Sequence, residues 1–348
     1  MAHGNVAHQP NDQAFVDAQL TSRPQLDTVA PLSITAVRET CTADLPRAIV
    51  TPLLNRDGRG IARPPPIRLE GKDMGGADYR HATDFVTTNG IRLAYKHSGG
   101  GEPVLLIAGS GSAGHFWTPH QTPALHAAGY ATVVFDNRGI PPSEAPAGKY
   151  SLADFVADTK GLIEALDLAP CRIVGMSLGS MIAQELAIDH PELVRSAVLI
   201  ATRARVDAAR LAQTEAEIAL VESGVRLPAV YEAATTVFKM FSPSTLDDDA
   251  AVASWLDVFE MSGTGTVATG QVWADLAGDR RAALRRVTAP CRVVTFTDDL
   301  ITPPHLGAEV AEAIPRCDLV EIPRCGHLGC LERPDAVNAA ITEFFDHN

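Results

Sequence analysis

From His81 onward, short apolar runs alternate with segments whose apolar residues recur at helical spacing. The run PVLLIAG (103–109) is continuously apolar, and ATVVFD (131–136) and CRIVG (171–175) are largely apolar. Such runs are typical of strands that are buried on both faces of a parallel sheet. Strands that alternate with helices build an α/β fold, in which a mostly parallel sheet carries helices on both faces.

Local signals mark several boundaries of these elements. Asn89-Gly90 separates two alternating apolar and polar segments, which predicts a hairpin with a two-residue turn. Ser151, with Asp154 three residues later, predicts the capped start of a helix. An amphipathic pattern predicts a final helix over residues 334–345.

The sequence predicts three parts. Residues 1–80 are rich in proline and glycine and sustain no period, which indicates an extension that wraps the core or a second subunit, with disorder as the alternative. Residues 81–202 and 281–348 form the α/β core. Residues 203–280 interrupt the alternation with a helical pattern, as expected of a lid inserted between two strands.

Composition limits the partners of the chain. The formal net charge of -13 argues against nucleic acid and anionic membranes, because both attract basic surfaces. No apolar run has the length of a signal peptide or a membrane span, and six cysteines in 348 residues do not suggest a disulfide framework. We therefore expect a cytoplasmic protein that acts on a small molecule and forms a homodimer if the extension wraps a second copy.

The strongest chemical motif is Gly175-Met176-Ser177-Leu178-Gly179, which fits G-x-S-x-G and follows a predicted buried strand. In this arrangement a serine is presented on a sharp turn between a strand and a helix. The flanking glycines let the strand and the helix approach closely. The motif indicates that Ser177 is a nucleophile, whereas a plain glycine turn is the alternative.

An activated serine needs a histidine base and a carboxylate that orients it. His327 follows the predicted strand DLVEIP, and Asp298 and Asp299 close the strand VVTFTDD. These side chains would therefore gather with Ser177 at the edge of the sheet where ligands bind in open α/β folds. Both aspartates are candidates for the acid.

Two backbone amides would stabilise the developing oxyanion. Leu178 directly follows the nucleophile and is expected to supply one of them. The other is expected from the glycine-rich turn 108–112, at Ser110.

Aromatic and methionine side chains gather near these motifs and predict an apolar substrate pocket. A packed lid core is the alternative. The candidates are His115, Phe116, Trp117, Met240, Phe241, Trp255, Phe259 and Trp273. A zinc site at Cys325, His327 and Cys330 is not expected, because a fourth ligand at matched spacing is absent. No metal or cofactor is required.

Taken together, these motifs make the chain similar to the α/β-hydrolase fold superfamily, in particular its esterase, non-haem haloperoxidase and carbon–carbon hydrolase branch. The matching segments include VVFDNRGIPPSEAP, IVGMSLGSMIAQELAIDHPELVRSAVLI and IPRCGHLGCLERPDAVNAAITEFF. The resemblance covers residues 85–348 and favours Asp299 as the acid, because it precedes Leu-Ile-Thr-Pro.

The chain departs from the family pattern at two loops. Ala108-Gly109 stands where the family usually has His-Gly, and Pro141-Pro142 stiffens a loop that usually ends in x-Gly. The resemblance implies a serine hydrolase of an ester, thioester or lactone of medium-sized apolar character. An isomerase, epimerase or cyclase of secondary metabolism, and a non-catalytic binding protein, are the alternatives.

Overall fold

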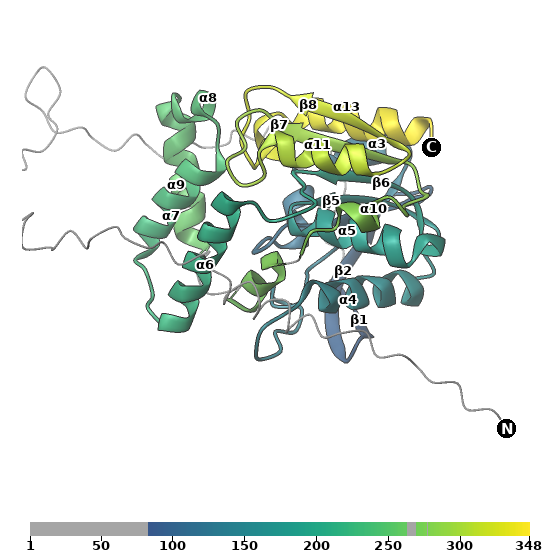
Figure 1. The fold of residues 1–348 in the computed structure, drawn as a ribbon, viewed down its shortest axis with the longest axis horizontal. Helices are drawn as coiled ribbons and strands as arrows, with labels where there is room; N and C mark the ends of the chain where they lie inside the picture. Colours follow the sequence, from purple (N-terminus) through teal and green to yellow (C-terminus); the bar gives the residue numbers. More distant parts are fainter. Residues whose placement is uncertain (1–82, 263–268, 277) are drawn as a thin grey trace, which may run out of the picture. The chain divides into compact units, whose positions relative to one another are not determined.

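The computed structural model describes residues 83–262, 269–276 and 278–348 (Figure 1). The predicted extension over residues 1–80 lies outside the described residues. Eight strands occur in the described part of the chain. They are β1 (Asp84–Thr88), β2 (Ile91–Ser98), β3 (Pro103–Ile107), β4 (Ala131–Phe135), β5 (Cys171–Met176), β6 (Val194–Ile200), β7 (Cys291–Phe296) and β8 (Cys317–Ile322).

The strands form one sheet in the order β1-β2-β4-β3-β5-β6-β7-β8. β1 and β2 form an antiparallel hairpin, β2 also pairs antiparallel with β4, and every later pairing is parallel. Asn89 and Gly90 turn the hairpin with φ angles of 46° and 75°, the left-handed values that a tight hairpin turn needs. The structure therefore confirms the mostly parallel sheet and the hairpin.

Helices cover both faces of the sheet (Figure 1). The core helices are α3 (Gln121–Ala127), α4 (Leu152–Ala165), α5 (Leu178–Asp189), α10 (Arg281–Leu284), α11 (Pro304–Ala313), α12 (Gly329–Glu332) and α13 (Pro334–Asp346). Three short 3-10 helices accompany them: η1 (Gly114–Trp117), η2 (Pro191–Leu193) and η3 (Thr269–Leu276). The predicted capping box at the start of α4 is present, because the Ser151 and Asp154 side chains each bind the backbone N–H of the other residue.

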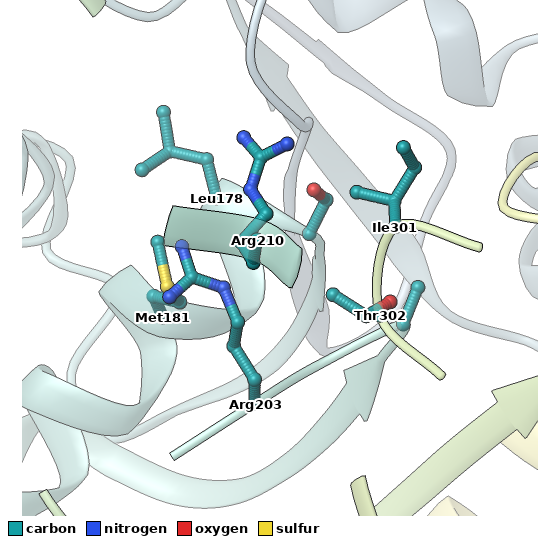
Figure 2. A pocket seen from close by; sticks show the side chains of 8 residues that line it. Leu178, Met181, Arg203, Arg210, Ile301 and Thr302 are labelled. Carbon is teal, nitrogen blue, oxygen red and sulfur yellow. The ribbon is translucent and has the colours of Figure 1, made fainter. Parts of the chain in front are cut away.

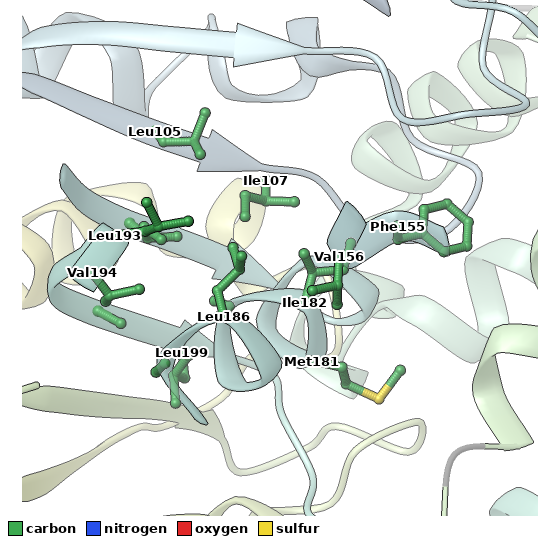
Figure 3. Close-up of a cluster of buried hydrophobic side chains, with 14 of the residues drawn as sticks. Leu105, Ile107, Phe155, Val156, Met181, Ile182, Leu186, Leu193, Val194 and Leu199 are labelled. Carbon is green, nitrogen blue, oxygen red and sulfur yellow. The ribbon is translucent and has the colours of Figure 1, made fainter. Parts of the chain in front are cut away.

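Successive side chains of the strands point to opposite faces of the sheet and belong to two separate hydrophobic clusters. Leu105 and Ile107 of β3 join a cluster with residues of α4, α5, α10 and α11, and Figure 3 shows part of this cluster. Val104 and Leu106, which point the other way, join a second cluster with residues of α3, α12 and α13. Because β3 is buried on both faces, its sequence is continuously apolar rather than alternating.

Four further helices lie between β6 and β7 in the chain and stand at one side of the sheet (Figure 1). They are α6 (Ala208–Ser223), α7 (Ala229–Met240), α8 (Pro243–Leu246) and α9 (Asp249–Ser262), and α7 packs against α9. We refer to α6–α9 together with η3 as the cap. The Glu332 carboxylate ties α8 to the core, because it accepts hydrogen bonds from Ser242 N at 3.0 Å and from Thr245 Oγ1 at 2.5 Å.

None of the helices in the described ranges is long and apolar enough to cross a membrane.

Candidate active site

Ser177 occupies a strained turn between β5 and α5. Its φ and ψ angles are 53° and -117°, which lie in a region that side-chain-bearing residues rarely adopt. The turn is held because Ser177 N donates a 3.0 Å hydrogen bond to Ile200 O on the neighbouring strand. The Ser177 side chain is partly accessible, while every residue of β5 is buried. The fold thus presents this hydroxyl at the carboxyl end of the central strand.

The two glycines of the motif are required by close backbone approach. A Cβ on Gly175 would overlap the carbonyl oxygen of Gly179, and a Cβ on Gly179 would overlap the carbonyl oxygen of Ile107. The overlapping atoms belong to the backbone, so a side-chain rotation cannot relieve either clash. The geometry agrees with the strand–turn–helix context that the sequence predicts for Ser177.

His327 and Asp299 form a buried pair in the loops that follow β8 and β7. His327 Nδ1 lies 2.8 Å from Asp299 Oδ2, and both side chains are almost completely buried. Asp298 instead lies beside Thr297, whose hydroxyl donates to its carboxylate at 3.4 Å. The structure therefore brings Asp299, rather than Asp298, to the histidine.

The protonation of this pair follows from its hydrogen bonds. Asp299 Oδ1 accepts from Ile301 N at 2.7 Å and from Thr302 N at 2.9 Å, and Oδ2 accepts from Thr302 Oγ1 at 2.7 Å. Burial alone would raise the pKa of Asp299, but His327 and the hydrogen bonds from Thr302 outweigh it and hold that pKa below its ordinary value. An ionised carboxylate can only accept, so Nδ1 of His327 carries the proton and Nε2 is the basic nitrogen.

A small pocket opens beside Ser177, with about 230 Å³ of empty space that is partly open to solvent (Figure 2). Its lining residues come from the segments that follow β5, β6 and β7 and from the first turns of α5 and α6. They are Ser177, Leu178, Met181, Ala201, Arg203, Arg210, Ile301 and Thr302. Thr302 links the pocket to the acid–base pair, because its Oγ1 lies 3.4 Å from His327 Nδ1. Among the described residues no hydrogen bond joins Ser177 Oγ to His327, a bond that often tightens only with substrate present.

None of the residues predicted for the pocket is among the residues that line it. Trp117 is completely buried in the core beside Phe116, and His115 is exposed. Three of the cap residues pack on one another, with ring centroids 4.8–6.2 Å apart: Phe241, Trp255 and Phe259. Trp273 lies under the Lys149 ammonium, 4.7 Å from its ring centroid. Met240 meets the histidine loop through its backbone, since Met240 O accepts from Leu328 N at 3.1 Å.

The loop predicted to form the oxyanion hole lies directly against the nucleophile. A Cβ built on Gly109 would lie 3.2 Å from Ser177 Cβ, so only a residue without a side chain fits there comfortably. Leu178 N belongs to the first residue of α5, whose early amides have no partner within the helix. The Asn137 side chain holds the start of this loop, because its Nδ2 donates a hydrogen bond to Ala108 O at 3.3 Å.

Gln271 of η3 connects the oxyanion loop to the proline-containing loop. Its Oε1 accepts from Gly111 N at 2.8 Å and from Ser110 Oγ at 3.2 Å, and its Nε2 donates to Arg138 O at 2.7 Å. Arg138 is itself fixed by a bidentate ion pair with Asp158, at 2.6 and 2.7 Å. Gln271 therefore sets the position of the loop that carries the expected oxyanion donor.

Sequence reasoning did not find Gln271, Arg203 or Arg210. All three lie where the chain leaves or re-enters the core around the cap, a region that carries no motif. The only available signal was the presence of arginines directly after the strand that ends at Ile200.

Cys325 and Cys330 flank His327 as buried free thiols. Burial raises the pKa of Cys325 to about 12, so it is a thiol at neutral pH. Within the described ranges, no group of three or more His, Cys, Asp or Glu side chains is placed to hold a metal ion.

Comparison with known proteins identifies the family of the chain. A family model described as the alpha/beta hydrolase family matches residues 104–340. The chain belongs to the alpha/beta hydrolase family. It is 49% identical over 257 residues to a Mycobacterium tuberculosis protein named as a non-heme bromoperoxidase, BpoC, and the match spans 73% of this chain and 98% of the relative.

A solved structure and one further relative extend the comparison. A crystal structure under the BpoC name from Mycobacterium tuberculosis superposes with a TM-score of 0.70 at 45% identity, covering 77% of this chain and 99% of the other. The 3-oxoadipate enol-lactonase 2 of Acinetobacter baylyi is 27% identical over 265 residues, which span 75% of this chain and 96% of the relative. The expectation of an α/β-hydrolase fold is thus confirmed, and relatives with hydrolase names share nearly their whole length with the chain.

Proposed function

We propose that the protein is a serine hydrolase that cleaves an ester, thioester or lactone of a small molecule through an acyl-enzyme. The observation that carries the proposal is the strained turn of Ser177 at the pocket, with the His327–Asp299 pair in the adjoining loops. The similarity to a protein named as an enol-lactonase supports a lactone among the candidate substrates.

The proposal assigns a role to each group. Ser177 Oγ attacks the carbonyl carbon while His327 Nε2 takes its proton, and Asp299 stabilises the imidazolium that results. The amides of Leu178 and Ser110 bind the oxyanion of the tetrahedral intermediate. His327 then gives the proton to the leaving oxygen or sulfur as the acyl-enzyme forms. A water molecule, deprotonated by the same Nε2, attacks the acyl carbon and restores the Ser177 hydroxyl.

The first test is the intact mass of the protein after incubation with a fluorophosphonate. We expect one adduct on the natural protein and none on Ser177→Ala. A folded natural protein that forms no adduct and hydrolyses none of a panel of esters, thioesters and lactones would contradict the proposal. Turnover that persists in Ser177→Ala would instead favour an isomerase or cyclase that uses the same pocket without an acyl-enzyme.

A further inference from the structure

The loop that carries His327 lies directly against the cap. This histidine loop, residues 323–328, connects β8 to α12. A Cβ built on Gly326 would lie 2.7 Å from Met240 O, which is closer than Cβ atoms pack in proteins. On the other side of the histidine, Leu328 N donates a 3.1 Å hydrogen bond to the same carbonyl oxygen. Both neighbours of His327 therefore contact the backbone of the cap.

The Glu332 carboxylate joins the same two segments through hydrogen bonds. Its Oε1 accepts from three groups of the cap, namely Ser242 N at 3.0 Å, Ser242 Oγ at 2.7 Å and Thr245 Oγ1 at 2.5 Å. Its Oε2 accepts at 2.5 Å from the backbone N–H of Gly326, the residue directly before His327. One carboxylate thus bridges the cap and the residue next to the expected base.

This bridge needs a side chain with two acceptor oxygens. Each oxygen of Glu332 accepts from a backbone N–H, Oε1 from Ser242 and Oε2 from Gly326, and a backbone N–H can only donate. A glutamine has one oxygen and one NH2 group, so in either orientation its NH2 group would face one of these two donors. Ser242 and Gly326 are both buried, so water is poorly placed to replace the lost hydrogen bond.

The position of the histidine loop matters because the base must reach the nucleophile. The core holds this loop on one side, since His327 Nδ1 lies 2.8 Å from Asp299 Oδ2 and Asp298 N donates to Cys325 O at 3.1 Å. Among the described residues no hydrogen bond yet joins His327 to Ser177 Oγ. The separation of these two groups therefore depends on where the loop lies, and a misplacement of about 1 Å can cost about 100-fold in rate.

We propose that Glu332 is a positioning residue for the general base: its carboxylate fixes Gly326 to the cap and thereby holds His327 within reach of Ser177. The cap then takes part in aligning the base as well as in covering the site. Glu332 acts through the loop, because it is not among the residues that line the pocket. This inference rests on the proposed hydrolase function, in which His327 Nε2 takes the proton of Ser177.

Glu332→Gln is the first test, with turnover of a 4-nitrophenyl ester as the assay. We expect kcat to fall about 10- to 100-fold and KM to stay within about threefold, because the base acts in the transition state and the pocket is unchanged. The rate constant for fluorophosphonate labelling of Ser177 should fall by a similar factor, because labelling needs the same base. Urea unfolding and circular dichroism define a temperature at which the variant is folded.

Glu309→Gln is the matched control. The Glu309 carboxylate, on α11, also bridges two parts of the chain, but it accepts from Arg205 at 2.6 and 2.8 Å rather than from the histidine loop, and its loss should leave kcat unchanged. A second pair of variants decides if Glu332→Gln does not fold. Thr245→Val removes one cap contact of Glu332 and should lower kcat by a smaller factor, whereas Thr235→Val, whose hydroxyl bonds within α7, should not.

A spectroscopic readout does not depend on turnover. The proton that His327 Nδ1 shares with Asp299 should give a strongly deshielded 1H NMR signal, because the two groups are buried and 2.8 Å apart. This signal should shift or broaden in Glu332→Gln and stay unchanged in Glu309→Gln. A Glu332→Gln variant that is less stable but keeps both kcat and the signal would overturn the positioning role, and so would a fall in kcat with an unmoved signal.

The outcomes also separate this inference from the proposed function. If the natural protein forms the fluorophosphonate adduct and Glu332→Gln is labelled at the natural rate, the hydrolase function stands and the positioning role is wrong. If the natural protein forms no adduct and cleaves no ester, the hydrolase function fails, and the NMR signal alone decides whether Glu332 positions His327.

Discussion

Replacing Gln271 with Met tests whether the cap positions the oxyanion loop. Methionine keeps the size of the side chain but removes its three hydrogen bonds, to Ser110 Oγ, Gly111 N and Arg138 O. Ser110 and Gly111 are exposed and can bind water instead, whereas Arg138 is buried and its carbonyl oxygen would be left without a partner. An unpaired buried carbonyl costs about 1–3 kcal/mol, so with two weaker losses we expect a stability loss of about 2–4 kcal/mol.

The kinetic effect separates positioning from simple stability. Removing an oxyanion donor lowers kcat by about 10²–10³ in a serine hydrolase, so displacing the loop that carries one should lower kcat roughly 10- to 100-fold. KM should change much less, because the loop acts on the transition state. The assay is ester hydrolysis at several substrate concentrations, at a temperature where urea unfolding shows the variant to be folded.

Gln121→Met is the matched control for this substitution. Gln121 is also a completely buried glutamine, and its Nε2 donates to Cys330 O at 3.1 Å, away from the oxyanion loop. It should lose stability while keeping kcat. A Gln271→Met variant that is destabilised but retains kcat within twofold would refute the positioning role and leave Gln271 as a packing residue.

Three more substitutions probe the site and its support. Gly179→Ala should prevent folding or reduce the free energy of unfolding severely, because the added methyl group overlaps a backbone carbonyl; circular dichroism and urea unfolding measure this. Asp299→Asn should lower kcat by about 10⁴ near neutral pH by favouring the wrong tautomer of His327, as in other serine hydrolases, and kcat that stays within tenfold would contradict the triad. The same variant should also lose less stability on acidification than the natural protein. Folding lowers the pKa of Asp299, so the ionised carboxylate stabilises the fold fully above its ordinary pKa of about 4, and this stabilisation is lost as the pH falls below that value. Arg138→Leu should destabilise the fold by about 3–5 kcal/mol, measured by urea unfolding, because the buried Asp158 carboxylate loses its charged partner and keeps a hydrogen bond from Asn89.

The features that the sequence predicts correctly depend on local backbone geometry or on chain order. Asn89-Gly90 specifies its hairpin through left-handed backbone angles. The strand β3 can be predicted because burial on both faces makes its sequence continuously apolar. The meeting of His327 with Asp299 is also foreseeable, since parallel strands place the loops after them at one edge of the sheet. These inferences need no knowledge of how the cap packs.

The pocket could not be predicted in the same way. Composition shows that the inserted segment is rich in aromatic residues, but it cannot say which face they occupy. In the structure Phe241, Trp255 and Phe259 pack against one another inside the cap. The polar side chains are the ones at the site: Arg203 lines the pocket, and Gln271 binds the oxyanion loop. The direction of these side chains depends on tertiary packing, which leaves no periodic trace in the sequence.

The two ends of the cap differ from its middle in what they contribute to the site. Arg203 and Arg210 lie where the chain enters the cap from β6, and Gln271 lies where it returns toward β7. The helices α7 and α9 pack mainly against each other and contribute no lining residue to the described pocket. Both junctions are anchored to the core, one through Gln184 and the other through Arg138. We therefore expect the position of the oxyanion loop to depend on the junction at Gln271 more than on the packing of α7 against α9.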